Sequence, residues 1–437
     1  MSLTTSIFVS VIAFLALLAI YRRDTASFGL PIAYLFALLL IHVPGAIAHL
    51  VGSNLPTPTI LTEKGMTMAA LGSVAFVIGS ALGRRGMPNL RGIRRQLIDN
   101  RRLAMFCLLG GWFFTYGLSF LGRIPSLGAA IEKGGAIWML GVILGLRVAI
   151  ARHDIAKTLL WFSAMAVYPL LMLLLGGFLS YGSTAAIIVL GGLAITLRKN
   201  RTVLMWTLIV SIFAFNAFLN YFDQRNTIRD AVWGGAPMAT RVQITYETFR
   251  DFEWFDADNT QQLSALDQRL NQNYFVGLAI TRIENGNVDY LYGRSVWEGA
   301  LGLVPRAFWP GKPVYAGSPK IVAEMTGLWL NPNTSFGVGN VMEFYINFGV
   351  PGVIGGFVLL GWLLSWLDRR AALAEFRGER TRIFLFFLPA VALIQPNGSI
   401  VELTSGSAAA VVAAYGWAWA YRFWFGRKLR RDSPRLT

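Results

Sequence analysis

Cysteine and histidine are scarce in this chain of 437 residues. Its one cysteine, Cys107, excludes a disulfide within the chain and any cysteine-cluster metal site. The three histidines, His42, His49 and His153, are too few and too scattered to suggest a metal site, so we expect no histidine cluster. We recognise no Ser/His/Asp hydrolase motif and no glycine-rich nucleotide fingerprint after a strand pattern. We therefore expect no metal and no cofactor.

Charged residues are also few, at 14% of the chain, whereas hydrophobic residues make up 55%. That apolar content is too high for one soluble core and indicates a polytopic membrane protein. The net charge of +16 would suggest a nucleic-acid partner in a soluble chain. In a membrane protein it is explained by basic residues on cytoplasmic loops, so we expect no nucleic acid.

Long apolar runs are abundant, and a helix needs about 20 such residues to cross a bilayer. We predict an all-α polytopic membrane protein with about 11 transmembrane helices. The first run ends in Tyr21-Arg22-Arg23-Asp24 without a small-residue cleavage site, so we interpret it as a true span and not a signal peptide. The predicted spans are 4–21, 28–51, 65–83, 103–122, 135–151, 158–180, 182–197, 202–221, 348–366, 383–398 and 404–424.

Alternation of these spans puts the basic clusters on one side. If Arg22 and Arg23 are cytoplasmic, so are 84–102 and the tail at 427–431, which are rich in arginine. The positive-inside rule then predicts an N-terminus on the outer side of the membrane and a cytoplasmic C-terminus. The predicted organisation is spans 1–8 in 1–221, a large outer loop at 222–347, and spans 9–11 with a basic tail in 348–437.

The large loop is where we expect function, because long ordered insertions are usually functional. A passive cap is the alternative. Its composition predicts a mostly helical segment: a polar continuation of the eighth span at 223–230, an amphipathic helix at 241–255 and a second helix at 264–283. A polar stripe with Arg269 on that second helix is equally consistent with a ligand-facing side or a solvated helix face.

A proline-rich segment at 304–313 cannot form a long helix, so we predict a rigid irregular loop. It carries Arg306, Trp309 and Lys312, and Lys320 follows shortly after. Arginine and lysine suit phosphate oxygens, and an aromatic face suits a sugar ring. The alternative is an interfacial tryptophan with basic side chains that reach toward lipid headgroups.

Two acidic positions are candidates for chemistry. Glu343 stands at the start of an otherwise apolar helix, where an acid is costly unless it is paired or functional. It is a candidate general base or an ion-pair partner of an arginine, and the sequence does not separate these roles. Asp256-x-Asp258 matches a metal-binding pattern of some glycosyltransferases, but no further ligands accompany it.

Three blocks between about 264 and 365 resemble the Wzy-type polymerases, which polymerise oligosaccharide repeat units of O-antigen and exopolysaccharide. The first block is Gly293-Arg294-Ser295. The second is Pro305-Arg306 with Trp309-Pro310-x-Lys312-Pro313. The third is Thr334-Ser335-Phe336 followed by Glu343-x-Tyr345-x-Asn347-Phe348-Gly349-x-x-Gly352.

The resemblance implies glycosyl transfer on the outer face of a bacterial inner membrane, so the large loop and the N-terminus would be periplasmic. The donor would be a glycan on undecaprenyl diphosphate and the acceptor a lipid-linked repeat unit, with membrane lipids and a chain-length regulator as further partners. It also implies an architecture like that of the integral-membrane (GT-C-like) glycosyltransferases, without metal or nucleotide sugar. Arg294 and Arg306 would stabilise the departing diphosphate. Glu343 would be the base, with Glu298 second. The residues expected to bind substrate are Arg269, Arg282, Glu298, Trp309, Lys312, Lys320, Ser335 and Asn347.

Other classes of protein remain open at this point. A polysaccharide ligase would share the donor and differ only in the acceptor. A flippase for lipid-linked oligosaccharides would have more spans and short loops, which the long loop argues against. A non-catalytic subunit of a synthase complex would use the loop as a docking surface.

Overall fold

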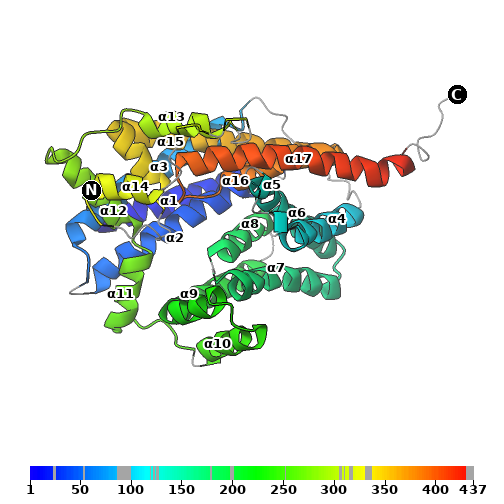
Figure 1. Cartoon of the computed structure of the whole chain (residues 1–437), viewed down its shortest axis with the longest axis horizontal. Helices are drawn as coiled ribbons and strands as arrows, with labels where there is room; N and C mark the ends of the chain where they lie inside the picture. The colour runs from blue at the N-terminus through cyan, green and yellow to red at the C-terminus, as the bar shows by residue number, and fades with distance from the viewer. Residues whose placement is uncertain are drawn as a thin grey trace.

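The computed structural model describes the chain apart from a set of short segments and the last residues. Within the described part every regular element is a helix, so the predicted all-α class is confirmed. Figure 1 shows the long helices lying side by side, with the loop helices α11 (Thr260–Arg269), α12 (Gln272–Glu284) and α14 (Ser318–Thr326) at the left end of the view. The segments left out are 23–25, 53–54, 86–99, 119, 122–123, 125–126, 178–179, 197–200, 251, 305–307, 310, 314–317, 330–336 and 430–437.

Six stretches of the described residues are helical, long and apolar enough to cross a membrane, which supports a membrane-embedded protein. One of them joins two consecutive helices, α5 and α6. An apolar stretch in α8 is shorter, at Gly182–Ile195. The six are α1 (Leu3–Arg22), α2 (Leu30–Val51), α3 (Thr59–Leu82), Leu127–Ala151, α7 (Ile155–Gly176) and α15 (Asn340–Phe376).

Two predicted spans are not single regular α-helices of the predicted length in the structure. The predicted span 103–122 divides into a 12-residue helix and a π-helical turn at Phe113–Gly117. The predicted span 383–398 forms a helix of only 13 residues, Arg380–Ala392. The remaining helices of the bundle are α4 (Arg101–Trp112), α5 (Leu127–Gly135), α6 (Ile137–Ala151), α8 (Ser180–Thr196), α9 (Arg201–Trp233), α16 (Arg380–Ala392) and α17 (Ile400–Leu429).

The large loop is mostly helical, as predicted. Helix α9 runs straight on from the apolar stretch into the polar residues, as expected for 223–230. The single helix predicted at 264–283 is wrong, because the chain breaks at Leu270 and Asn271. Asn271 turns inward there and hydrogen-bonds Thr62 of α3, so tertiary contacts override the helical pattern. The loop helices are α10 (Met238–Arg250), α11 (Thr260–Arg269), α12 (Gln272–Glu284), α13 (Arg294–Gly302) and α14 (Ser318–Thr326).

Glycines on α3 allow close approach between helices. A Cβ atom at Gly65 would lie closer than 3.0 Å to the backbone of Asn273 in α12. The same holds for Gly79 against Val358 in α15. Small residues at such contacts are a common way for apolar helices to associate in a membrane. Helix α3 is thus the link between the loop helix α12 and the long helix α15.

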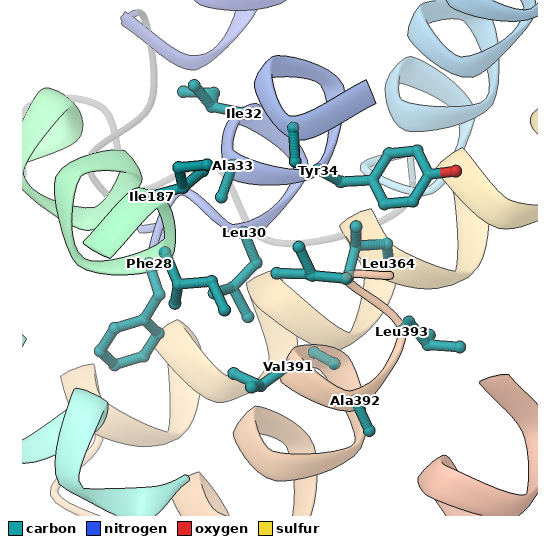
Figure 2. Close-up of a cluster of buried hydrophobic side chains, with 14 of the residues drawn as sticks. Phe28, Leu30, Ile32, Ala33, Tyr34, Ile187, Leu364, Val391, Ala392 and Leu393 are labelled. Atoms are coloured by element: carbon teal, nitrogen blue, oxygen red, sulfur yellow. The ribbon is translucent and has the colours of Figure 1, made fainter. Parts of the chain in front are cut away.

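One part of the hydrophobic core surrounds the first turns of α2. Figure 2 shows Phe28, Leu30 and Ala33 packed with Ile187 of α8, Leu364 of α15 and Val391 of α16. All of these side chains are buried. In a membrane-embedded bundle such a cluster is stabilised mainly by close van der Waals packing between the helices.

A network of buried polar groups lies next to this cluster. Asp368 of α15 accepts hydrogen bonds from the hydroxyl of Ser27 at 2.6 Å and from the backbone N–H of Phe28 at 2.9 Å. Arg147 of α6 forms a buried ion pair with Glu375 at 3.0 Å and donates to the carbonyl of Ser27 at 2.7 Å. Because buried polar groups are costly without partners, this network determines where α2, α6 and α15 meet.

Candidate functional site

Two of the three sequence blocks meet at Asn347. Its Oδ1 accepts from the backbone N–H of Gly293 at 3.0 Å, and its Nδ2 donates to the hydroxyl of Ser295 at 2.8 Å. Nδ2 also donates to the carbonyl of Glu343 one turn earlier, at 2.7 Å. Asn347 is buried and satisfied on both ends of its amide, so it holds the start of α13 against α15. We infer a positioning role for it, although the sequence suggested direct substrate binding.

Glu343 lies fully buried beneath α13 and at the start of α17. Its Oε2 accepts from the backbone N–H of Ile400, the first residue of α17, at 2.6 Å. Its Oε1 has no hydrogen-bond partner among the described residues. Among those residues Glu343 forms no ion pair with an arginine, and Arg306, a candidate partner, lies outside them. A carboxylate with one capped and one unpartnered oxygen can hold or accept a proton there.

Glu298 lies one helix turn beyond Arg294 on α13 and is only half-buried. Burial raises the pKa of Glu298 above its ordinary value, although Arg294 and Lys320 act in the opposite direction. Its charge also acts on Glu343, so the two carboxylates are neighbours. Because solvent reaches Glu298 and does not reach Glu343, Glu298 is the more accessible of the two predicted acids.

The cations of this site come from α13 and α14. Arg294 is exposed and pairs with Glu324 at 2.6 Å. Lys320, two residues after the start of α14, is close enough to Glu298 to stabilise its charged form. The structure therefore brings together Arg294, Glu298, Lys320 and Glu343, four of the predicted site residues, with Glu324 as an acid that the sequence analysis missed.

Lys312 has a different role from the one predicted. Its ammonium group is buried and donates to the carbonyls of Leu301 at 3.2 Å and Val304 at 2.6 Å. These carbonyls lie at the C-terminal end of α13, where a cation also complements the helix dipole. Lys312 thus ties the proline-rich segment to α13 and does not present its charge to a phosphate.

Arg282 and Trp309 occupy the periphery. The guanidinium of Arg282 packs against Gly327 just after α14, and its Nε is buried without a hydrogen-bond partner among the described residues. Trp309 is 44% exposed, and Trp297 and Trp329 are more exposed still. These aromatic side chains are available to a sugar ring or to the lipid interface, the two alternatives that the sequence left open.

Arg269 does not belong to this group of residues. It lies at the end of α11, and its guanidinium stacks on Phe222 of α9 at 5.3 Å. In Figure 1 α9 and α10 lie at the lower edge of the molecule, whereas α13 lies at the upper edge. Arg225 stacks on the same phenyl ring at 5.5 Å and was missed by the sequence analysis. Its position three residues after Phe222 on a polar helix was the only signal.

A buried polar network anchors α11 to the bundle and was also missed. Nε2 of His49 lies 2.9 Å from Oδ1 of Asp267, which also accepts from the hydroxyl of Thr57 at 2.6 Å and from Asn271 at 2.6 Å. Burial alone would raise the pKa of Asp267, but the hydrogen bonds from His49, Thr57 and Asn271 outweigh it and hold the pKa below its ordinary value. The network is an anchor for the loop.

The Asp256-x-Asp258 pair forms a turn. The carboxylate of Asp256 accepts from the backbone N–H of Asp258 at 2.9 Å, as aspartate commonly does in turns. No group of three or more metal-ligating side chains occurs among the described residues.

Two predicted site residues, Arg306 and Ser335, lie outside the described residues. Comparisons with protein-family models, with curated proteins and with solved structures give no match for this chain. The resemblance to the Wzy-type polymerases therefore rests on the three sequence blocks.

Proposed function

We propose that this chain is a membrane glycosyltransferase that polymerises oligosaccharide repeat units carried on undecaprenyl diphosphate, producing O-antigen or exopolysaccharide. The reaction takes place at the outer face of a bacterial inner membrane. In this proposal the chain has about 11 spans, with the N-terminus periplasmic and the C-terminus cytoplasmic, and its architecture is like that of the GT-C-like glycosyltransferases.

One observation carries the proposal. Blocks of the sequence that are about 50 residues apart converge through Asn347, and they place Arg294, Glu298 and Glu343 in one region. Carboxylates beside cations are the groups that transfer from a diphosphate-linked sugar requires. One group accepts a proton, and the others stabilise the charge on the leaving group.

The chemical step exchanges one bond to the anomeric carbon for another. The acceptor hydroxyl oxygen bonds to the anomeric carbon of the donor glycan, and its proton passes to a carboxylate. The bond from that carbon to the diphosphate oxygen breaks, and its electron pair leaves with the undecaprenyl diphosphate. The products are a longer glycan on the acceptor lipid and free undecaprenyl diphosphate.

Glu298 is the proton acceptor in this proposal, because it is accessible and close to cations. Glu343, buried behind it, caps α17, and the charge of Glu298 acts on its carboxyl group. This reverses the order in which the sequence ranked the two acids. Arg294 and Lys320, together with Arg306, stabilise the diphosphate as its charge develops. Arg294 must leave Glu324 for the diphosphate, an exchange that an exposed ion pair makes at little cost.

The test is reconstitution of the purified chain with a lipid-diphosphate-linked oligosaccharide, followed by gel separation of the products. Wild type should give a ladder, and both Glu298→Gln and Arg306→Ala should abolish it. Arg306→Lys should also be impaired, because bidentate hydrogen bonding is lost. Arg382→Gln, at an exposed arginine of α16 that pairs with Glu379, is the charge-matched control and should retain the ladder.

The alternatives give different products. Transfer of one glycan to a different acceptor would indicate a polysaccharide ligase. Movement of the lipid-linked oligosaccharide across the vesicle without transfer would indicate a flippase. A full ladder from Glu298→Gln would contradict the assignment of the base, and full ladders from both variants would favour a non-catalytic role for the loop.

A further inference from the structure

A polar cavity lies between α9, α10 and α11, away from the carboxylate site. Its volume is about 850 Å³, which is in the range of small-molecule sites. Six amide side chains line it, together with serine and threonine hydroxyls, two glutamates and two arginines, Arg250 and Arg269. Gln224, Gln261 and Gln268 are among the lining residues that are exposed to solvent. Amides, hydroxyls and carboxylates hydrogen-bond a ligand rich in hydroxyl groups, whereas an alkyl chain would leave them unsatisfied.

One aromatic ring, Phe222, lines the cavity, and two guanidinium groups stack on it. Arg225 and Arg269 stack on it at 5.5 and 5.3 Å. Arg269 also lines the cavity and is exposed, whereas Arg225 is half-buried, with its Nε screened from solvent and without a hydrogen-bond partner among the described residues. Neither arginine pairs with a carboxylate in the part of the chain that the structure describes.

The positive charges here repel one another. Arg229, one turn beyond Arg225 on α9, acts on both Arg225 and Arg269. Like charges held together in a partly buried place cost free energy unless an anion offsets them. Arginine is suited to carboxylate and phosphate, because its planar group makes two parallel hydrogen bonds.

We propose that this cavity binds a carbohydrate that carries an anionic group, either a carboxylate or a phosphate ester. The sugar hydroxyls bond to the amides and hydroxyls of the lining, and the anionic group lies at Arg269. Arg225 does not line the cavity, but it shares the Phe222 ring and adds to the positive charge there. The inference rests on the proposed function in one respect: the carbohydrate is then the glycan part of the lipid-linked substrate. It adds that this glycan is acidic and that it is held by α9, α10 and α11 at a distance from the reacting atoms.

The test is direct binding to the full chain in detergent, measured by calorimetry and without turnover. The probes are trigalacturonate as an acidic oligosaccharide, a trisaccharide phosphate monoester, maltotriose as a neutral one, and a short isoprenyl diphosphate without sugar. We expect one or both acidic sugars to bind at least tenfold more tightly than maltotriose, and the tighter of the two identifies the anionic group. Binding should weaken as salt is raised, since ion pairs are screened.

Arg269→Gln and Arg225→Gln should each weaken binding of the acidic sugar at least tenfold, and Arg382→Gln should leave it unchanged. Because both arginines stack on Phe222, the melting temperature of each variant is measured as well. Gln268→Glu tests the same positive charge independently. It adds a negative charge beside Arg269 at an exposed position and removes no contact with the Phe222 ring. It should weaken the acidic sugar more than maltotriose.

Equal affinity for the acidic and neutral sugars would overturn the proposal, as would wild-type affinity in both arginine variants. Binding of the isoprenyl diphosphate that is lost in Arg269→Gln and kept in Arg306→Ala would overturn it too, because the cavity would then be a site for the carrier. Failure here is separable from failure of the proposed function: a chain that makes polymer and does not bind acidic sugars contradicts only this inference. A chain that binds them and transfers nothing contradicts only the polymerase.

Discussion

Three charged neighbours surround Glu298 and act on its pKa in opposite directions. Burial raises it, Arg294 and Lys320 lower it, and Glu324 raises it further. An ordinary glutamate titrates near pH 4.3. If Glu298 is the general base, it must be ionised to work, so the rate should rise with pH through a pKa above that value. The fall in rate on the acid side should therefore lie higher than for an exposed glutamate.

Substitutions around Glu298 should shift the acid side of the pH–rate profile in predictable directions. Arg294→Gln removes a cation that favours the charged form, so the acid limb of the pH–rate profile should move to higher pH. Glu324→Gln removes a repelling charge and should move it to lower pH. The rate of Glu298→Gln should fall by about 100-fold or more, the range for loss of a general base. The measurement is kcat/KM for chain transfer against pH, and identical profiles in all variants would rule out Glu298.

Asn347 should be sensitive to small chemical changes. Asn347→Asp removes the donor that reaches Ser295 and the carbonyl of Glu343, and it adds a negative charge near a buried carboxylate. Such a change leaves buried partners unsatisfied, at about 1–3 kcal/mol. We expect a lower melting temperature and loss of transfer. Asn287→Asp, at an exposed turn of the same loop, should change neither quantity.

Between elements, close helix contacts make the glycines of α3 intolerant of a side chain. Gly79→Ala would place a Cβ closer than 3.0 Å to the backbone of Val358, and such overpacking costs about 1–3 kcal/mol. Gly355→Ala on α15 meets nothing within 4 Å. The control should be neutral or slightly stabilising, since alanine favours a helix over glycine. Thermal unfolding in detergent measures both, and equal melting temperatures would contradict the packing of α3 on α15.

The buried ion pair between α6 and α15 should behave as a coupled pair. Arg147→Met leaves Glu375 buried with one partner fewer, and removing one member of a buried pair costs about 3–5 kcal/mol. The double variant Arg147→Met with Glu375→Leu should be less destabilised than the sum of the two singles. A double-mutant cycle on melting temperature measures this coupling, and strictly additive effects would show that the pair contributes nothing.

For the whole molecule, the proposed topology can be tested by cysteine labelling, because only one native cysteine has to be replaced. Cys107 is the one cysteine of the sequence, so a Cys107→Ala background contains no thiol and should give no labelling. Asn285→Cys, at an exposed turn of the large loop, should react with a membrane-impermeant maleimide when the inner membrane is intact. Arg377→Cys, at the exposed end of α15, should react only after that membrane is opened. The reverse result would invert the proposed orientation.

Much of the fold was predictable because apolar runs and helical periodicity are local properties. The helices at 4–21 and 28–51 appear where the hydropathy placed them. Helix ends and breaks were less predictable. The break at Asn271 arises from contacts with α2 and α3, more than 200 residues away in the sequence, and no local pattern signals it.

The candidate site was predictable in its residue types and less so in its arrangement. Glu343, Glu298 and Arg294 were identified from the sequence, because acids and arginines stand out in apolar or motif-like surroundings. Lys312 and Arg269 were expected in the same site but make different contacts. Lys312 donates to backbone carbonyls, and Arg269 stacks on Phe222. Side-chain partners decide such roles, and they come from other elements.

The sequence by itself determined that this is an all-helical chain suited to a membrane, with a large helical loop rich in charge, because hydrophobic content and its period are fixed by residue order. Only the tertiary structure decided that Asn347 joins two motif blocks, that Glu343 is sealed behind Glu298, and that two arginines share one phenyl ring beside a polar cavity. The physical reason is that burial, ion pairing and hydrogen bonding depend on which distant residues share a space, and packing alone sets that.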